Sequence, residues 1–412
     1  MLIEFRVDNH RSLRDEQVLT MESGRVGGVA DSRPRQVDGH SESLLPVVAL
    51  YGANASGKTN VLNALAFMRD AVLFSFNSWP PDQGVPRNQF AWGPKRDEPS
   101  FFEVTVLVDS VRHQYGFGLS DECILEEWLF AWPNGKKQLW FERDGATYKF
   151  GGNLKGDNEV IEGVTRTNAL FLSTAVQFKH PQLQAIFSWF RAIRPINLAQ
   201  SFSMIHTEQG IARTLFPDDD TLEEPLSEQF LTLLRSADLG IVDLKVEKNE
   251  PIEKARRLTR IRFHLKHQSD ADDAWLPLDQ ESKGTRTLFR FAVPILEAIR
   301  DGGVLLCDEL EASLHPSLAQ QIVRRFNDPK TNPHHAQLIF TTHDTNLLGT
   351  TLGEPALRRD QVWLTEKDDQ GSTVLYPLTD YKPRKAENLE RGYIQGRYGA
   401  IPFLGDFTFA GE

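Results

Sequence analysis

At 412 residues the chain is long enough for one large domain or for two or three ordinary ones. Its hydrophobic content of 40% and charged content of 25% are those of a globular protein with a sizeable core. The net charge of −11 argues against a protein whose whole surface binds nucleic acid. Two cysteines, Cys123 and Cys307, are too few for a disulfide framework, so we expect a reducing, cytoplasmic compartment. The N-terminus lacks signal-peptide features and no run of 18 apolar residues occurs, so no membrane-spanning helix is expected.

The N-terminal half alternates strand patterns with one helix. Residues 1–20 alternate apolar and polar side chains, which predicts a strand pair, and a Gly/Ser/Arg/Pro-rich loop follows over 23–43. Residues 44–51 form a short apolar run that is typical of a buried parallel strand. Apolar residues at helical spacing predict a helix over 58–76, and alternation predicts strands between 101 and 140.

The C-terminal half has a similar alternation after a helical stretch. Residues 165–235 are predicted to be helical with an acidic break at 217–225, and strand patterns return over 241–265. A long helix containing Leu288 and Ile299, a strand from Val304, a helix over 316–326 and a strand from Gln337 are then predicted in order. This alternation predicts the α/β fold class, with a parallel sheet wrapped by helices and split by a long, mostly helical insertion. The expected domains are an N-terminal lobe over 1–120, the insertion over 121–240, and a C-terminal lobe over 241–412.

A complete phosphate-binding loop pattern, G-x-x-x-x-G-K-[ST], runs from Gly52 to Thr59. It follows an apolar strand and opens a helix, which is the context that the pattern requires. The backbone amides would surround the β-phosphate of ATP, Lys58 would lie near the β- and γ-phosphates, and the Thr59 hydroxyl would hold Mg²⁺. The candidate ATP-binding residues of this segment are Gly52, Asn54, Ala55, Ser56, Gly57, Lys58, Thr59 and Asn60.

Carboxylates and a histidine end two of the predicted strands. Asp308 follows an apolar strand and is suited to hold Mg²⁺, whereas Glu309 can polarise the attacking water. His343 ends the Gln337 strand, where ligands of parallel sheets bind, and we expect it to sense the γ-phosphate. Glu309, His343 and Lys58 are therefore the predicted catalytic residues, and Thr59 and Asp308 the predicted metal ligands.

Two other segments allow two interpretations each. Ser282 is a good N-cap for the long helix, or Ser282, Gly284 and the helix N-terminus form an anion-binding surface that faces another subunit. The run Lys254, Arg256, Arg257, Arg260, Arg262 and Lys266 is a strand with one solvated basic face, or it contacts a phosphate backbone.

Together these residues resemble the ABC-type ATPase heads of the SMC, RecF and OLD proteins. In that resemblance Ser282 to Gly284 is the signature, Asp308 and Glu309 are the Walker B pair, His343 is the switch histidine, and 311–316 is the D-loop. Residues 9–12 are similar to the N-terminal motif of these heads, which places Arg11 and Ser12 near the nucleotide. The Q-loop glutamine is either Gln89 or Gln114. The resemblance implies a P-loop NTPase fold of the ABC-ATPase head type with a mixed sheet, and a homodimer through ATP-bridged heads or a higher oligomer.

Within that group the chain resembles AbiL-type (RloA-like) ATPases of bacterial abortive infection. The stretches 237–241, 281–285, 313–316, 357–363 and 393–402 carry this likeness, which spans the chain. It implies an antiphage sensor or regulator that acts with a separately encoded, nuclease-like effector. OLD proteins carry a TOPRIM-type nuclease domain after the ATPase, and we expect none here. Glu366, Asp368 and Asp369 are interpreted as a turn between strands rather than as a metal site.

The mechanism that these features suggest is ATP hydrolysis between two heads. Two alternatives remain at this point. ATP could be a structural latch that is hydrolysed slowly or not at all, although Glu309 favours hydrolysis. The chain could also be a DNA-repair type of ATPase that binds nucleic acid through residues 254–266, although neither a long coiled coil nor a basic surface is evident.

Overall fold

Three β-sheets organise the computed structural model, which describes residues 1–26, 31–198, 208–216, 226–237, 240–249, 260–271, 273–351, 353–382 and 387–402. The helices within these residues are α1 (Lys58–Phe74), α2 (Asn158–Val164), α3 (Phe171–Gln177), α4 (Leu183–Arg191), α5 (Glu208–Leu215), α6 (Leu226–Ser236), α7 (Lys283–Asp301), α8 (Pro316–Asn327) and α9 (Leu389–Ile394). Short 3-10 turns lie at Pro94–Asp97, Leu278–Gln280, Thr345–Leu347, Arg359–Gln361 and Leu378–Tyr381. No helix in these ranges is both long and apolar enough to span a membrane.

The central sheet has six strands in the order β16-β15-β3-β14-β13-β9. These strands are β3 (Val47–Gly52), β9 (Ile193–Ile196), β13 (Val304–Cys307), β14 (Gln337–Thr341), β15 (Val362–Lys367) and β16 (Thr373–Pro377). All neighbouring pairs are parallel except β15 and β16. The expected α/β fold class is thus confirmed, with a phosphate-binding loop between β3 and α1 and a mixed sheet. The adjacency of β13 and β14 confirms that the strand of Asp308 lies beside the strand of His343.

A second sheet of seven antiparallel strands has the order β2-β1-β4-β5-β6-β7-β8. Its strands are β1 (Leu2–Asp8), β2 (Gln17–Thr20), β4 (Ser100–Val108), β5 (Val111–Leu119), β6 (Ile124–Trp132), β7 (Gln138–Asp144) and β8 (Thr147–Phe150). The predicted N-terminal strand pair is confirmed by β1 and β2. Because β6 pairs with β5, this sheet continues across residue 120, where the sequence suggested a domain boundary.

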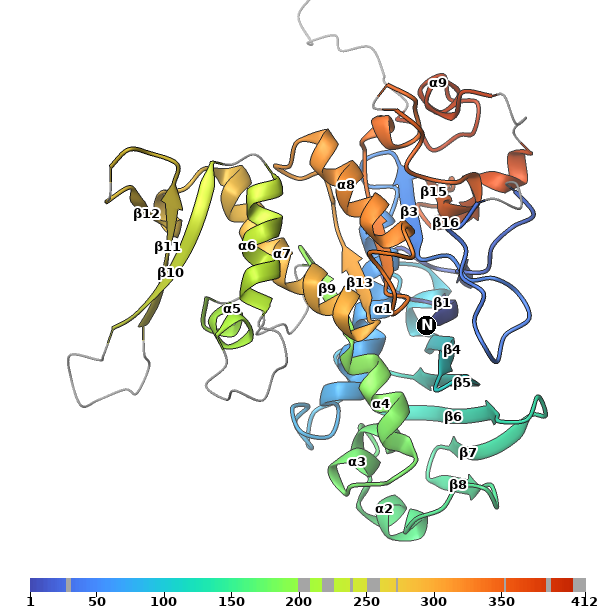
Figure 1. Ribbon diagram of the computed structural model, residues 1–412. Helices are drawn as coiled ribbons and strands as arrows, with labels where there is room; N and C mark the ends of the chain where they lie inside the picture. The colour runs from blue at the N-terminus through green and yellow to red at the C-terminus, as the bar shows by residue number, and fades with distance from the viewer. Residues whose placement is uncertain are drawn as a thin grey trace, which may run out of the picture.

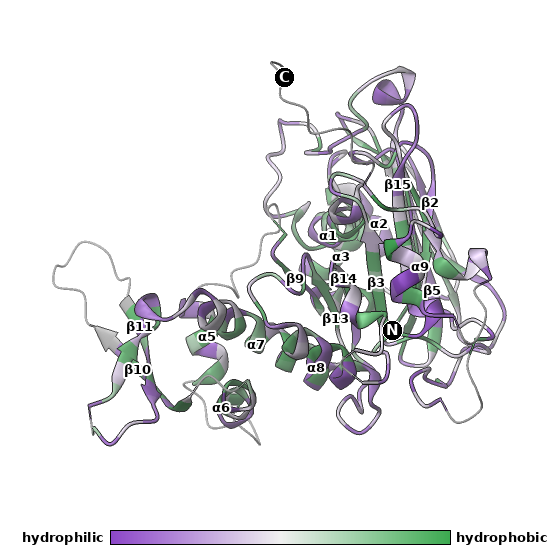
Figure 2. Cartoon of the chain, turned by 90° about the horizontal axis from the view of Figure 1, so that it is seen from above, coloured by the Kyte–Doolittle hydropathy of each residue, from purple (hydrophilic) through white to green (hydrophobic). Residues whose placement is uncertain are grey.

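The central sheet is covered on both faces, as its apolar strands predict. Val48 and Leu50 of β3 contribute to one core with α1, α3, α4 and the seven-stranded sheet. Val47, Ala49 and Tyr51 point the other way into a core with α7, α8 and α9. In Figure 2 the ribbon of β3 is coloured as hydrophobic and lies inside the body. Alternate residues of one strand therefore join the two halves of the molecule.

An arm projects from this body and carries the third sheet (Figure 1). It consists of β10 (Ile241–Asn249), β11 (Arg260–His267) and β12 (Trp275–Pro277), packed against α5, α6 and α7. The strand pattern predicted over 241–265 is confirmed for the described part. Residues 217–225 and 250–259, which include the predicted acidic break and Lys254, Arg256 and Arg257, lie outside the described residues, as does Asp238.

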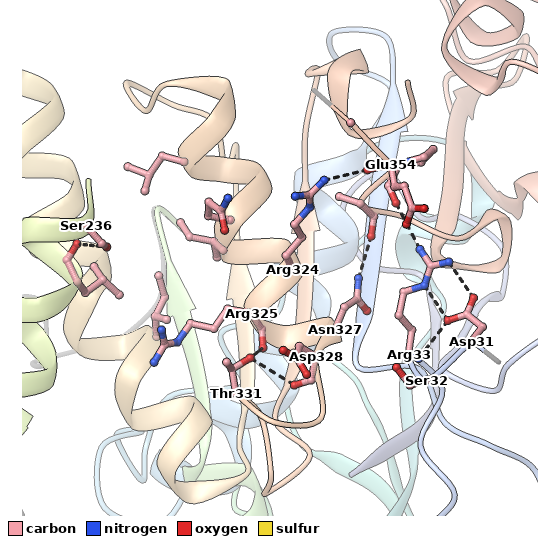
Figure 3. Close-up of a pocket in the computed structure, with 18 of the residues that line it drawn as sticks. Asp31, Ser32, Arg33, Ser236, Arg324, Arg325, Asn327, Asp328, Thr331 and Glu354 are labelled. Carbon is pink, nitrogen blue, oxygen red and sulfur yellow. Dashed lines mark hydrogen bonds and ion pairs between the residues drawn. The ribbon is translucent and has the colours of Figure 1, made fainter. Parts of the chain in front are cut away.

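A groove of about 1200 Å³ runs along α8 between the arm and the body (Figure 3). Leu233, Leu288 and Leu318 line its arm side, from α6, α7 and α8. On its other side Arg33 is paired with Asp31, and Arg324 donates to the carbonyl of Glu354 at 3.0 Å. None of the residues predicted for the nucleotide site is among the described residues that line this groove.

Candidate nucleotide-binding site

The phosphate-binding loop turns tightly between β3 and α1, as its glycines predict. Gly57, the N-cap of α1, has a φ of 107°, a left-handed conformation that favours glycine. A Cβ on Gly57 would lie only 2.0 Å from Oγ1 of Thr373 and 2.9 Å from Oγ of Ser12. Asn54 and Ala55 at the tip of the loop are exposed. The loop thus leaves the N-terminus of α1 open to an anion, where the amides and the helix dipole favour negative charge.

Lys58 is folded back into the loop that precedes it. Its ammonium donates to the carbonyls of Gly52 at 2.8 Å and Ala53 at 3.0 Å. Burial lowers the pKa of Lys58 to about 8, and the nearby carboxylates of Asp308, Glu309 and Glu311 act in the opposite direction. A phosphate oxyanion would stabilise this partly desolvated charge far more than water does.

Asp308 and Thr59 converge at the carboxyl end of the central sheet. Thr59 Oγ1 donates to Asp308 Oδ1 at 2.9 Å, and Thr341 Oγ1 donates to the same oxygen at 2.7 Å. This hydroxyl and carboxylate are hard oxygen donors, which fit Mg²⁺. Among the described residues no group of three or more His, Cys, Asp or Glu side chains could hold a metal by itself. Thr59 and Asp308 would therefore hold a magnesium ion here together with phosphate oxygens and water.

Glu309 follows Asp308 in an unusual backbone conformation. Its φ is 51°, which is uncommon for a residue with a side chain, and its amide donates to Thr341 Oγ1 at 2.7 Å. The residue is exposed. A single threonine hydroxyl therefore holds both the Asp308 carboxylate and the strained Glu309 backbone.

His343 lies just past β14 and is linked to Glu311. Its backbone amide donates to Glu311 Oε1 at 2.6 Å, and Glu311 Oε2 is buried without a hydrogen-bond partner among the described residues. Partial desolvation and the Lys58 charge lower the pKa of His343, although the neighbouring carboxylates oppose this shift. The positive charge of Lys58 thus disfavours protonation of the His343 imidazole.

Ser12 links the start of α1 to β16 beside the phosphate-binding loop. Its hydroxyl accepts from Asn60 Nδ2 at 2.7 Å and shares a 2.7 Å hydrogen bond with Oγ1 of Thr373. Thr373 also donates to the carbonyl of Ser56 at 2.8 Å, and the Ser56 hydroxyl lies 2.6 Å from Oγ1 of Thr365. The β15–β16 hairpin and the N-terminal motif thereby hold the loop in shape.

Arg11 and Gln89 share a hollow beside the start of α1. The hollow has a volume of about 640 Å³ and is lined by Arg11, Asn60, Arg87, Asn88, Gln89, Ala91 and Arg96. The Arg11 amide donates to the Asn88 carbonyl at 2.7 Å, which fixes the two loops together. Gln114, in contrast, lies within β5, opposite Thr105 and Phe130. Of the two glutamines, the structure brings Gln89 to the loop.

Ser282 caps α7, and Gly284 lies against the segment after Asp308. The Ser282 hydroxyl accepts from the Thr285 amide at 3.1 Å, and Ser282 is exposed. A Cβ on Gly284 would lie 3.1 Å from the carbonyl of Ser313, a residue with a φ of 64°. The predicted signature and the predicted D-loop therefore form one surface at the N-terminus of a 19-residue helix. The hydrogen bonds of the Ser282 hydroxyl in the described chain are local to α7.

Comparison with known proteins agrees with this arrangement. Residues 47–349 match the family described as "AAA domain, putative AbiEii toxin, Type IV TA system". The chain belongs to this family. Its AAA domain extends from β3 to the segment just after β14, so the loop, Asp308, Glu309 and His343 all lie within it. It is consequently a P-loop protein of an ATP-binding family. A search of curated proteins finds no match.

Two solved structures of similar overall size resemble this AAA protein weakly. The SMC head domain of Thermotoga maritima is 13% identical with a TM-score of 0.41, and the match covers 91% of this chain and 98% of that one. The Smc head domain of Pyrococcus furiosus, with an extended coiled coil and bound to the C-terminal domain of ScpA, is 12% identical with a TM-score of 0.41. That match covers 96% of this chain and 98% of the other.

Four residues of the AAA site were not singled out from the sequence: Glu311, Thr341, Thr365 and Thr373. Glu311 was assigned only to the D-loop, and Thr341 only to a strand. The two others lie more than 300 residues from the loop they hold. Nothing in their local pattern distinguishes them from ordinary strand threonines.

Proposed function

We propose that this AAA protein hydrolyses ATP in sites that form between two copies of the chain. The observation that carries the proposal is that one chain contains two different half-sites, each of which is incomplete by itself. One half contains Lys58, Thr59, Asp308 and an exposed Glu309. The other half contains an exposed Ser282 at a helix N-terminus, with Gly284 packed on the D-loop. A two-fold axis would place each half against the other copy.

In this mechanism the chain supplies position and charge. Lys58 and the loop amides would bind the β- and γ-phosphates, and Thr59 and Asp308 would hold Mg²⁺. When bound, Mg²⁺ would neutralise charge on those phosphate oxygens. Glu309 would orient and polarise the attacking water, and His343 would donate a hydrogen bond to the charge that develops on the γ-phosphate. Ser282 and Gly284 of the second copy would close the site and exclude water.

A mixing experiment tests the shared site. Lys58→Ala and Ser282→Arg should each be inactive alone, whereas their heterodimer retains one intact site. A 1:1 mixture should recover about a quarter of wild-type ATPase activity if dimers form at random. The matched control mixes Lys58→Ala with Glu309→Gln, which damage the same half-site and should not complement. Activity in either single variant close to wild type, or equal recovery in both mixtures, would reject the shared site.

We further propose that the ATPase regulates antiphage defence through a separate effector. Support comes from the resemblance of 357–363 and 393–402 to AbiL-type proteins and from a family description that refers to a putative toxin and a toxin–antitoxin system. The test is phage plating on bacteria that express the chain together with its neighbouring gene product. Protection should require both proteins and should be lost with Lys58→Ala. Full protection by Lys58→Ala would show that ATP binding is not the signal.

A further inference from the structure

The arm presents a sheet face opposite to the one that packs on α6 and α7. In β10 and β11 the apolar residues Leu244, Val246, Phe263 and Leu265 share one face and join the core with α6 and α7. The register places the alternate residues on the opposite face. These outward residues are Asp243, Lys245, Glu247, Arg262, His264, Lys266, Trp275 and Pro277. The arm projects from the body (Figure 1), and on this face Asp243, Glu247 and Arg262 are exposed, whereas His264 is mostly buried.

Trp275 is the single tryptophan, tyrosine or phenylalanine among these outward residues of the described sheet, and two lysines adjoin it. The Lys245 ammonium lies 4.7 Å from the centre of the Trp275 ring, and the Lys266 ammonium lies 5.8 Å from it. Trp275 is only half-buried, although a large aromatic side chain is usually more stable inside a core. The ring is therefore partly exposed beside two cationic side chains, of which Lys245 also forms an ion pair with Glu247 at 3.6 Å.

We propose that this face binds single-stranded nucleic acid, with a base stacked on Trp275 and phosphates bound by Lys245, Lys266 and Arg262. Stacking on an aromatic ring beside a cationic track is the general way in which proteins bind single strands without reading sequence. Lys266 on β11 is paired with Trp275 on the edge strand β12, and Lys245 lies one strand further across the sheet, on β10. Both lysines are therefore on the same side of the ring, where they can contact phosphates that lead away from a stacked base.

The charge balance of the face favours a polyanion. Three cationic side chains, Lys245, Arg262 and Lys266, stand against two acidic ones on the outward face of a chain whose net charge is −11. An acidic protein surface would form ion pairs with the lysines but would have no group that stacks on the exposed indole. We favour nucleic acid because its phosphates can contact the lysines and its bases can stack on the indole. The basic residues 254–257 lie outside the described structure and form no part of this site.

The face is connected to the signature of the proposed ATPase. His267 at the end of β11 contacts Glu281 at 2.6 Å, and Glu281 immediately precedes Ser282. The short turn Leu278–Gln280 joins β12 directly to this point. Strand binding and the ATPase are nevertheless separate claims, because the face can bind nucleic acid whether or not ATP is hydrolysed.

Fluorescence anisotropy of labelled oligo(U) and oligo(dT), each of roughly 16 nucleotides, tests the proposal. The wild-type chain should bind both, and the affinity should fall steeply between about 50 and about 200 mM salt. Lys245→Glu with Lys266→Glu should lower the affinity at least about tenfold and reduce the salt slope by about 1.4, the share of two phosphate contacts. Trp275→Leu should lower the affinity at least about fivefold and should abolish any quenching of tryptophan fluorescence that depends on stacking.

Lys149→Glu is the matched control. Lys149 is an exposed lysine on β8, in the seven-stranded sheet, and its replacement should leave the affinity unchanged. ATP binding by each variant verifies folding and separates failure of this proposal from failure of the proposed ATPase. Absence of binding by wild type at low salt would overturn the proposal, as would equal loss in the control. Displacement by polyglutamate as effective as that by oligo(U) would indicate an acidic protein partner instead and would also overturn it.

Discussion

Thr341 donates its hydroxyl to the Asp308 carboxylate at 2.7 Å across the β13–β14 pair. The Thr341 hydroxyl oxygen also accepts a hydrogen bond from the backbone amide of Glu309 at 2.7 Å. One side chain thereby fixes the predicted magnesium ligand and the predicted catalytic carboxylate together. β13 and β14 are neighbours in the sheet. Any shift of one strand relative to the other would therefore change the hydrogen bonds that position both Asp308 and Glu309.

Thr341→Val should impair turnover much more than binding. Valine matches threonine in shape but removes both hydrogen bonds, so Asp308 loses one donor and the left-handed Glu309 loses its anchor. We expect a loss of about 1–3 kcal/mol in the free energy of unfolding and at least a tenfold loss of ATPase rate. ATP affinity, measured with a fluorescent analogue, should change less than about threefold because the loop amides remain. Thr342→Val, which removes only a bond to the Asp344 amide, is the control.

ATP affinity should depend on the protonation of Lys58. Burial lowers its pKa to about 8, so the side chain is mostly a cation below this pH and mostly neutral above it. Affinity for ATP should therefore weaken as pH rises from 7 to 9, by up to about tenfold per unit once Lys58 is neutral. Calorimetry in buffers of different ionisation enthalpy should show proton uptake on binding above pH 8, since phosphates restore the charge.

Lys58→Arg provides the contrast, because the guanidinium remains charged over this range. Its affinity for ATP is expected to be weaker but independent of pH. A pH dependence of the same size in Lys58→Arg would mean that another group titrates.

Gly57→Ala should damage the loop for a steric reason. The new Cβ would meet Thr373 Oγ1 at 2.0 Å, in a backbone with a φ of 107°. Gly135→Ala tests the backbone effect alone, because Gly135 has a φ of 72° with nothing within 4 Å of a Cβ. We expect about 1–2 kcal/mol of destabilisation for Gly135→Ala and a larger loss for Gly57→Ala. ATP binding, followed by filter retention of labelled nucleotide, should be lost only in Gly57→Ala.

Glu281→Ala should uncouple the arm from the signature. Glu281 is buried and contacts His267 at 2.6 Å, so its removal leaves the Ser282 cap without that anchor. ATP binding to the isolated chain should be unchanged, whereas steady-state ATPase activity should fall about tenfold or more because the signature is displaced. Asp279→Ala, an exposed neighbour, should retain wild-type activity. Normal turnover in Glu281→Ala would show that the arm does not position Ser282.

Local patterns were enough to predict which segments meet around the loop. Its glycines, the Asp308 strand and the position of His343 are encoded within short segments, and parallel pairing of β13 with β14 follows from their apolar runs. The parts that were not predicted depend on contacts distant in sequence. Thr365 and Thr373 reach the loop only because β15 pairs with β3.

The four-residue strand β9 also escaped prediction. It contains Pro195 and begins two residues after Arg191, the last residue of α4, so its apolar residues continue the helical pattern before it. Its strand conformation depends on pairing with β13, which follows more than 100 residues later. The continuous seven-stranded sheet, which contains β1, β2 and β4 to β8, was likewise hidden, because the order of antiparallel strands is decided by packing rather than by period.

The most direct test of the shared ATPase site is the mass of Glu309→Gln, measured by light scattering with ATP and Mg²⁺ and then with ADP. Removing the catalytic carboxylate should preserve binding and trap the closed state, so ATP should double the mass or tighten a dimer, and ADP should not. Addition of Ser282→Arg to the same chain should weaken that assembly, because both sites of the dimer then carry the substitution. An unchanged mass with ATP, together with no ATP hydrolysis by wild type, would contradict the shared site and would leave ATP as a static latch.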